Sequence, residues 1–327
     1  MAAGRRQGTL DAVTVAAMFS LEPWTIQRIG SPQVFQTGET YRGAPLIDYQ
    51  HPHDLFMGLG AEYRRATPTG SWYVGADLVG APTLGPEPFM HRASADIFPT
   101  APLSHHSLDS THITPGVLRT GLRVGTWGVE GSWFHGREPD ERRTDLDLGR
   151  LDSYAARLSW TRGPWQAQAS GARRHLPEAT TPYDADTLTA SLAYVRTDSR
   201  LTAVTAAFGQ KREIHGNFEA YLFEGVMRTT ARGRLAVRAE SVDKDILDAG
   251  FHPRGAFHRH RHSQVGAVTL GYLHDVLSLA AGALSVGGDV TVYAVPTNLE
   301  ESYGSPRSLH LFVRYGLRVA TDARHAH

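Results

Sequence analysis

The chain has 327 residues, enough for one large domain, and it has no cysteine, so neither disulfides nor thiolate metal sites can form. Lysine plus arginine and aspartate plus glutamate both number 33, and this balance gives no electrostatic case for a nucleic-acid partner. Mean hydropathy is -0.30, and the sequence holds no run of about 18 apolar residues that could form a membrane-spanning helix.

Apolar and polar residues alternate through most of the chain, and this period of two predicts strands. In residues 184–195, Leu188, Leu192 and Tyr194 fall on one face, whereas the other face is small and polar. The same pattern returns in residues 127–135, 154–161 and 309–318, with arginine and glutamate on the face that also carries glycine and serine. A small soluble barrel cannot bury so many large side chains, so the apolar face is expected to meet lipid and the polar face to line a lumen.

The predicted elements follow in chain order, with short turns and long links in strict alternation. The expected strands are residues 9–21, 55–65, 71–79, 112–124, 125–135, 152–160, 165–173, 184–195, 201–210, 218–229, 234–242, 264–274, 277–295 and 308–319. The link over residues 22–54 is expected to be a long loop, and the strand over 277–295 to project beyond the membrane or to contain a bulge. The fold class predicted is all-β, a transmembrane antiparallel β-barrel of about fourteen strands, with short periplasmic turns and long extracellular loops.

The whole chain, residues 1–327, is interpreted as a single barrel domain, closed by pairing of the last strand with the first. Residues 1–8 read MAAGRRQG, a residual turn without the apolar segment of an export signal, and residues 320–327 are expected to be a frayed tail. The start is therefore expected to be truncated, which leaves the strand count and the closure open.

Two of the long links concentrate imidazole, thioether and carboxylate groups. The candidate metal ligands are His51, His53, Asp54 and Met57 in the first, and Met90, His91, His105, His106, Asp109 and His112 in the second. Imidazole suits copper and zinc, and thioether adds affinity for Cu(I), so copper or zinc are the candidate ions. Histidines in such loops can equally hydrogen-bond backbone and brace a folded plug, and both alternatives stay open.

A second histidine-rich tract lies in the link over residues 244–262. Its histidines are His252, His258, His260 and His262, interleaved with arginine. Such tracts can bind metal, but they can also be solvated and weakly basic. His325 and His327 belong to the tail.

Two weaker patterns concern other chemistry. The loop EPDERRTDLDL carries Glu138, Asp140, Glu141, Asp145 and Asp147. Its oxygen atoms could hold Ca²⁺, although no EF-hand pattern is present and a solvated loop is favoured. The run of Asp109, Ser110 and His112 invites a hydrolase interpretation, which is disfavoured because adjacent residues cannot form a triad by spacing alone.

Charged residues on the polar faces of the strands are expected to line the lumen. These lumen-lining candidates are Arg119, Arg123, Glu130, Arg157, Arg234, Arg238, Glu240, Arg314 and Arg318. Mixed-charge walls can select solutes in a water-filled pore, and they can equally pair and help to plug it.

Five segments carry a family resemblance. They are GETYRGAPLIDYQHPHDLFM at residues 38–57, PEPFMHRASA at 86–95, HHSLDSTHITPGV at 105–117, GREPDE at 136–141 and YAVPTNLEESYG at 293–304. Together they resemble a family of uncharacterised proteobacterial outer-membrane β-barrel proteins, members of which are often encoded near copper and heavy-metal resistance genes.

The resemblance implies a location in the bacterial outer membrane, in contact with the lipid bilayer. The expected function is a porin-like or metal-associated transport or permeation protein for small solutes or metal ions. The alternatives are a non-conducting, metal-binding surface barrel and, less favoured, a membrane-embedded hydrolase; the chain is not expected to be an enzyme.

Overall fold

A computed structural model describes residues 10–179, 183–196, 202–214, 216–244, 263–279 and 282–317 of the chain. Its main sheet consists of β1 (Leu10–Phe19), β4 (Phe56–Thr67), β5 (Gly70–Gly80), β6 (Thr114–Val124), β7 (Trp127–Phe134), β8 (Ser153–Arg162), β9 (Trp165–Arg174), β10 (Ala185–Arg196), β11 (Thr202–Glu213), β12 (Gly216–Arg228), β13 (Gly233–Lys244), β14 (Ser263–Leu279), β15 (Gly282–Ala294) and β16 (Arg307–Leu317). A separate hairpin consists of β2 (Ser31–Tyr41) and β3 (Ala44–Gln50). The short helices are α1 (Glu22–Thr25), η1 (Ala93–Ala95), α2 (His105–Leu108), η2 (Ser110–His112) and α3 (Glu300–Tyr303). No helix in these described ranges has the length and hydropathy needed to cross a membrane.

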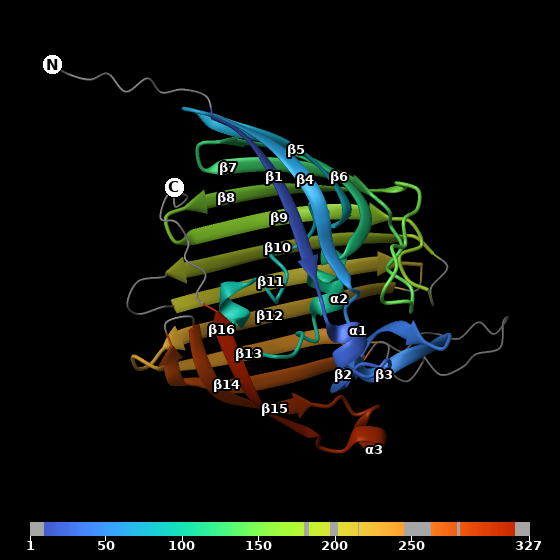
Figure 1. The fold of residues 1–327 in the computed structure, drawn as a ribbon. Helices are drawn as coiled ribbons and strands as arrows, with labels where there is room; N and C mark the ends of the chain where they lie inside the picture. The colour runs from blue at the N-terminus through green and yellow to red at the C-terminus, as the bar shows by residue number, and fades with distance from the viewer. Residues whose placement is uncertain are drawn as a thin grey trace.

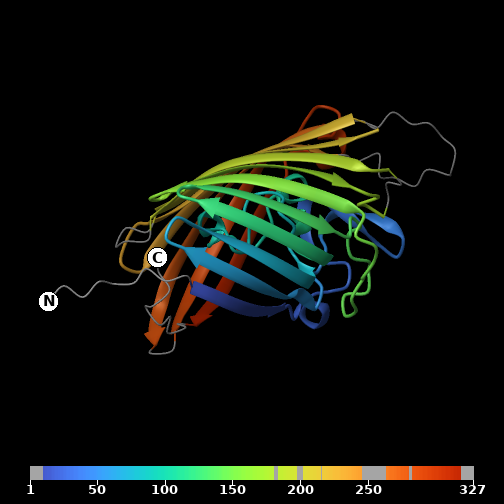
Figure 2. The ribbon, with the colours of Figure 1, turned by 90° about the horizontal axis from the view of Figure 1, so that it is seen from above.

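The fourteen strands of the main sheet are all antiparallel and pair in chain order, apart from β1, which pairs with β4. The sheet curls strongly, so that its concave side encloses the cyan helical segment that contains α2 (Figures 1 and 2). In the described part of the chain, β1 and β16 stand at the two ends of the strand order.

The convex face of the sheet is a continuous apolar surface. Leu122, Val129 and Leu158 are cross-strand neighbours on β6, β7 and β8, and their side chains are 54%, 58% and 47% exposed. Exposed aromatic residues flank this belt, with Trp127 beside the short turns and Trp133 beside the long links. Apolar side chains on the whole outer face and an aromatic girdle at each end are the features of a transmembrane β-barrel in a bilayer. The predicted fold class and the outward direction of the apolar faces are therefore confirmed.

Two predicted element boundaries are wrong. The strand expected over residues 277–295 is divided, because β14 continues to Leu279 and β15 begins at Gly282. A register shift between Asp275 and Leu277 moves the alternation by one residue, so the sequence pattern breaks off at His274 although the strand continues.

The link over residues 22–54 is also more ordered than expected, since it holds α1 and the β2–β3 hairpin. Phe35, Glu39 and Asp48 have positive φ angles, and the hairpin register shifts between its paired segments. These irregularities interrupt the period of two and hide both strands from a pattern search.

The core of the molecule lies inside the curled sheet, between its β11–β15 wall and residues 81–113, which we call the lumen loop. Ile97 and Phe98 of this loop pack against Val226 and Leu273 of the wall. Leu103 joins a second cluster with Phe35 of the hairpin. The lumen loop and the hairpin thus occupy one side of the lumen.

Candidate functional site

Buried ion pairs fix the lumen loop to the wall. The Arg92 Nε donates to Glu224 Oε1 on β12 at 2.6 Å, and its Nη1 donates to Asp109 Oδ2 at 2.9 Å. Glu224 is fully buried and also accepts hydrogen bonds from Arg238 Nε at 3.1 Å and from Ser94 Oγ at 2.9 Å. A buried charge is tolerated only when it is paired and hydrogen-bonded, and this network meets that condition at Glu224.

Neutral hydrogen bonds attach the start of the lumen loop to the opposite side of the sheet, at β7 and β9. Thr83 N donates to Ser132 Oγ at 2.9 Å, and Gly85 N donates to Ser170 Oγ at 2.8 Å. Gly85 has a φ of +80°, and a Cβ there would lie 2.1 Å from the Leu108 carbonyl oxygen. A side chain at this position would therefore separate two segments of the lumen loop.

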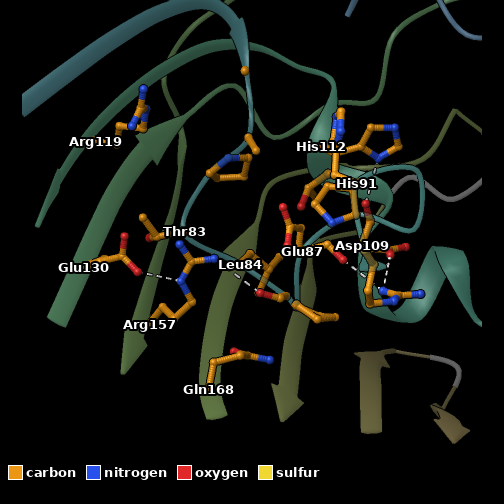
Figure 3. A pocket seen from close by; sticks show the side chains of 18 of the residues that line it. Thr83, Leu84, Glu87, His91, Asp109, His112, Arg119, Glu130, Arg157 and Gln168 are labelled. Carbon is orange, nitrogen blue, oxygen red and sulfur yellow. Dashed lines mark hydrogen bonds and ion pairs between the residues drawn. The ribbon is translucent and has the colours of Figure 1, made fainter. Parts of the chain in front are cut away.

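A chamber of about 790 Å³ lies between the lumen loop and the opposite wall (Figure 3). Thr161 and Gln166 line it close to the short turns, and Met57 and His112 line it towards the long links. Charged side chains around it are paired across neighbouring strands. Arg119 Nε donates to Asp77 Oδ2 at 2.7 Å.

A second ion pair in the chamber repeats this arrangement two strands further along the sheet, between β8 and β7. Arg157 Nε donates to Glu130 Oε2 at 2.7 Å, and Tyr73 Oη donates to Glu130 Oε1 at the same distance. The chamber thus contains both signs of charge in fixed positions, beside apolar residues such as Leu59 and Val79.

The predicted lumen residues divide between two environments. Arg119, Arg123, Glu130 and Arg157 line the chamber. The others contact the lumen loop, with Arg238 donating to the Thr100 carbonyl, Glu240 accepting from Ser104, and Arg234 and Arg314 both paired with Asp96. Arg318 lies outside the described residues.

Five of the predicted metal ligands form a closed ring of imidazoles, which we call the histidine ring. Its members are His51, His53, His112, His105 and His106. Around this order the centroids of successive imidazoles are 6.3, 5.6, 5.2, 5.4 and 6.1 Å apart. All five line one small cavity of about 20 Å³. Phe89 packs against three of them and forms an apolar side of the cluster.

Neighbouring oxygen atoms orient the rings. His53 Nδ1 donates to Glu22 at 3.0 Å, His105 Nδ1 to Asp109 Oδ1 at 2.6 Å, and His112 Nδ1 to the Asp109 carbonyl at 2.8 Å. The Nε2 atoms of His53, His106 and His112 are buried without a hydrogen-bond partner. Buried polar atoms are rarely left unpaired, so these three nitrogens mark a position where a ligand would be accommodated.

The histidines of the ring differ in pKa, because burial and neighbouring charges act on them differently. Burial holds the pKa of His106 and of His112 well below the ordinary value. Although burial opposes it, the Glu39 carboxylate, 2.9 Å from His51 Nε2, raises the pKa of His51. His106 and His112 are thus neutral at pH 7, whereas His51 is the member suited to carry a proton.

The remaining predicted ligands lie around the ring but not in it. Asp54 lines the small cavity and pairs with Arg143 at 3.2 Å, and burial raises its pKa to about 6. Met57 and Met90 belong to an apolar cluster, and His91 lines the chamber. The sulfur atoms predicted as soft ligands therefore do not face the small cavity.

Three residues that sequence reasoning missed complete the surroundings of the ring. Glu22 pairs with His53, and Glu39 pairs with His51. Arg143 pairs with both Glu39 and Asp54. Glu39 lies within the first of the five resembling segments, which is the one signal that could have drawn attention to it. Glu22 and Arg143 are far from the histidines in sequence and had no such signal.

Ser110 Oγ donates to the His106 carbonyl at 3.5 Å, and the Asp109 carboxylate binds His105 rather than His112, so these residues do not form a nucleophile and base pair. In the acidic loop, oxygen atoms of Asp140, Asp145 and Asp147 lie within 4.8 Å of one another, the one such group with three donors among the described residues. The nitrogens of the histidine ring are more widely spaced.

The other acidic residues of that loop have structural contacts. Glu141 accepts hydrogen bonds from Thr40 and from the backbone of Arg42 and Gly43 in the turn of the hairpin. Glu138 Oε1 lies 3.7 Å from Nη1 of Arg174 on β9. The second histidine tract, with His252, His258, His260 and His262, lies outside the described residues, as do His325 and His327.

No protein-family model and no curated protein matches this chain. Among solved structures, it is similar to an anion-selective porin from Comamonas acidovorans, at 13% identity over 79% of this chain and 76% of the porin, with a TM-score of 0.44. It is also similar to a loop-deletion mutant of OmpT, an outer membrane protein of Vibrio cholerae, at 11% identity over 83% and 82% of the two chains, with a TM-score of 0.45. A third similar structure is OccK11 (OpdR) of Pseudomonas aeruginosa, at 10% identity over 94% and 77%, with a TM-score of 0.42. At these identities and scores, a shared function does not follow from the likeness.

Proposed function

We propose that this protein is a bacterial outer-membrane permeation protein of the porin type, with a lumen narrowed to admit small polar solutes. Its continuous apolar belt requires a bilayer, and closed barrels with short turns and long loops are the form in which sheets cross the outer membrane. The observation that carries the proposal is the chamber of about 790 Å³ left between the lumen loop and the wall.

The shape of the lumen supports a narrow passage rather than a wide one. Ile97, Phe98 and Leu103 fill the side of the lumen next to β11–β15. Among the described residues, the chamber lies mainly on the side next to β1–β10, and it reaches from Thr161 and Gln166 near the short turns to Met57 and His112. A solute entering from the short-turn side would meet charged and hydrogen-bonding side chains together with apolar ones over this depth.

The charge pattern supports a preference for small polar solutes with both donors and acceptors. Arg119 and Arg157 are each paired with a carboxylate, so at these two positions the walls offer fixed charges that are largely compensated locally. Such walls attract hydrogen-bonding solutes and disfavour apolar ones, because a polar lining compensates the loss of water only for polar molecules.

Conductance of the refolded full-length protein in a planar bilayer tests this proposal. We expect discrete steps of small amplitude in the wild type. Gln168→Trp would narrow the chamber, since Gln168 lines it, and it should lower the step amplitude. Ala169→Trp places the same side chain on the adjacent, outward-facing position and should leave the amplitude unchanged. An absence of steps at every voltage in the wild type would refute permeation.

A second candidate is a non-conducting surface barrel, and the fixation of the lumen loop favours it. Arg92, Glu224 and Arg238 are 5% exposed or less and hold the loop by several charged hydrogen bonds. A loop held in this way is a fixed plug rather than a gate that moves to open a pore. The histidine ring also lies beside the chamber on the side of the long links, where His112 lines both the chamber and the small cavity. In that case the wild type and the Gln168→Trp variant would both be silent in the bilayer.

A further inference from the structure

The histidine ring joins two segments that are separate in sequence. His53 lies in the link between β3 and β4, whereas His106 and His112 belong to the lumen loop. The small cavity among them has a volume of about 20 Å³, the size that a single small ion or a water molecule occupies. Any group bound there would connect the two segments at the long-link end of the chamber.

Three nitrogen atoms of the histidines that line this cavity have properties of metal ligands. The Nε2 atoms of His53, His106 and His112 are buried and unpaired. The opposite nitrogens of His53 and His112 donate to Glu22 and to the Asp109 carbonyl, at 3.0 and 2.8 Å. Metal-binding histidines typically donate their second nitrogen to a carboxylate or a carbonyl in this way, which fixes the tautomer and orients the free nitrogen.

The spacing of the imidazoles also fits a shared ion. With metal–nitrogen bonds of about 2.0–2.1 Å, two imidazoles on one tetrahedral ion have centroids roughly 5–6 Å apart. Of the three ligands considered, His53 and His112 meet this spacing, with centroids 5.6 Å apart, whereas His106 has its ring contacts with His51 and His105. No three donor atoms of the ring are yet within 4.8 Å of one another in the described residues. Binding would require the His106 ring to move towards His53 and His112.

We propose that the histidine ring is a binding site for one borderline transition-metal ion of the Cu²⁺ and Zn²⁺ class, with His53, His106 and His112 as ligands through Nε2. His51 is a positioning residue, because its Nε2 is already committed to Glu39 and its Nδ1 donates to the Pro52 carbonyl. Neutral imidazole suits this class of ion, whereas the dehydrated, oxygen-rich shell that Ca²⁺ or Mg²⁺ needs is not offered.

The bound ion would clamp the lumen loop to the link that follows the hairpin. Because the ligands come from both segments, an ion that binds only the folded arrangement stabilises it by mass action. The site does not require conduction, so it applies equally to a permeation protein and to a non-conducting barrel. Metal binding and conductance are separate measurements, and failure of one proposal leaves the other standing.

The test uses full-length protein refolded in detergent, purified without a polyhistidine tag. The tract with His258, His260 and His262 could itself bind metal, so alanine replaces His252 and these three residues. This protein is the parent for all variants below. Cu²⁺ or Zn²⁺ is titrated by calorimetry, and the Cu²⁺ complex is examined by electron paramagnetic resonance for nitrogen hyperfine coupling. We expect one ion per chain, nitrogen coupling, and a higher melting temperature with the ion.

Two variants and a control decide the assignment. His53→Ala with His112→Ala should weaken binding at least 100-fold, and Glu22→Gln, which keeps all ligands, should weaken it about 10-fold through loss of ring orientation. His175→Ala removes an exposed histidine that is paired with Asp184 and should bind as the parent does. Retained β-barrel mobility on unheated gels verifies folding. If the parent binds no ion saturably, or if the double variant and Glu22→Gln both bind like the His175→Ala control, the proposal is wrong and the ring only braces the loop.

Discussion

Arg92 and Glu224, 132 positions apart in sequence, meet inside the barrel with their Nε and Oε1 atoms 2.6 Å apart. Arg92 belongs to the lumen loop and Glu224 to the wall strand β12. Glu224 also accepts from Arg238, so this carboxylate is shared by two buried guanidinium groups, and Asp109 is a second partner of Arg92. The position of the loop, and with it the width of the chamber, depends on this carboxylate.

Replacement of Glu224 by glutamine should therefore destabilise the barrel and loosen the loop. Removing one partner of a buried ion pair leaves charges uncompensated, and a loss of about 3–5 kcal/mol in the free energy of unfolding is expected. Urea unfolding in lipid vesicles measures it, and the bilayer conductance of the variant should exceed that of the wild type. Asp186→Asn, which breaks the exposed pair with Arg173, should cost less than about 1 kcal/mol. Similar losses in the two variants would show that the buried network does not hold the loop.

Because the apolar belt meets lipid, a charged substitution there should destabilise the protein much more than the same substitution on the face that lines the chamber. Val129 faces outward and is 58% exposed, whereas Ser159, on the adjacent strand β8, lines the chamber. Val129→Arg should lower the free energy of unfolding from vesicles by about 2–4 kcal/mol, because the charge would lie in lipid. Ser159→Arg places the same side chain in the polar chamber and should cost much less. Equal costs would contradict the assignment of the two faces.

The alternation of apolar and polar residues was sufficient to predict the strands of the main sheet and the face on which each side chain lies. Outward residues such as Trp127, Leu188 and Leu311 could be assigned because every position in a regular strand follows from its neighbours. The pattern failed where the backbone departs from it, at the register shift next to Asp275 and at Phe35 in the hairpin, whose φ angle is positive. Neither irregularity has a signature in composition.

The candidate site was predictable only in part. The five histidines of the ring stand out by residue type, but which of them meet is decided by how the lumen loop folds back. The contact of His53 with Glu22, or of His51 with Glu39, joins segments through tertiary structure alone. Met57 and Met90 illustrate the converse, since a thioether near histidines in sequence packs here as an ordinary apolar side chain.

Gly38 should be essential for the packing of the hairpin against the ring. It has a φ of +128°, and a Cβ at this position would lie 2.1 Å from Cε1 of His106. Gly38→Ala should therefore displace the His106 ring and increase protease cleavage within the hairpin. Gly43→Ala is a matched control, because Gly43 also has a positive φ, +74°, but a Cβ there would meet no atom within 4 Å. The control should show only the backbone strain of about 1 kcal/mol. Equal cleavage of both variants would exclude the overlap as the cause.

Glu138 should make the stability depend on pH. Burial, together with the nearby Glu178, raises its pKa to about 7. A carboxyl group with a raised pKa in the folded state contributes stability that is complete below its unfolded pKa of about 4.5 and is lost as the pH rises to 7. Glu138→Gln should therefore match the wild type at pH 4.5 and exceed it by about 2–3 kcal/mol at pH 8 in urea unfolding. Glu301→Gln, on the exposed helix α3, should keep the wild-type profile. A gain that is the same at both pH values would refute this origin.

The pairing of Arg157 with Glu130 should determine the ion preference of the chamber. Both side chains line it, and their Nε and Oε2 atoms are 2.7 Å apart, so the field of each is largely compensated by the other. Arg157→Gln leaves the carboxylate uncompensated in a confined polar space, where a fixed charge attracts its counterion more strongly than at an open surface. The reversal potential across a salt gradient should shift towards cation preference. Arg157→Lys keeps the positive charge and should leave the reversal potential near that of the wild type, which separates charge from shape. A shift of the same size in both variants would mean that the geometry of the guanidinium, and not its charge, sets the preference; no shift in either would place the conducting path away from this pair.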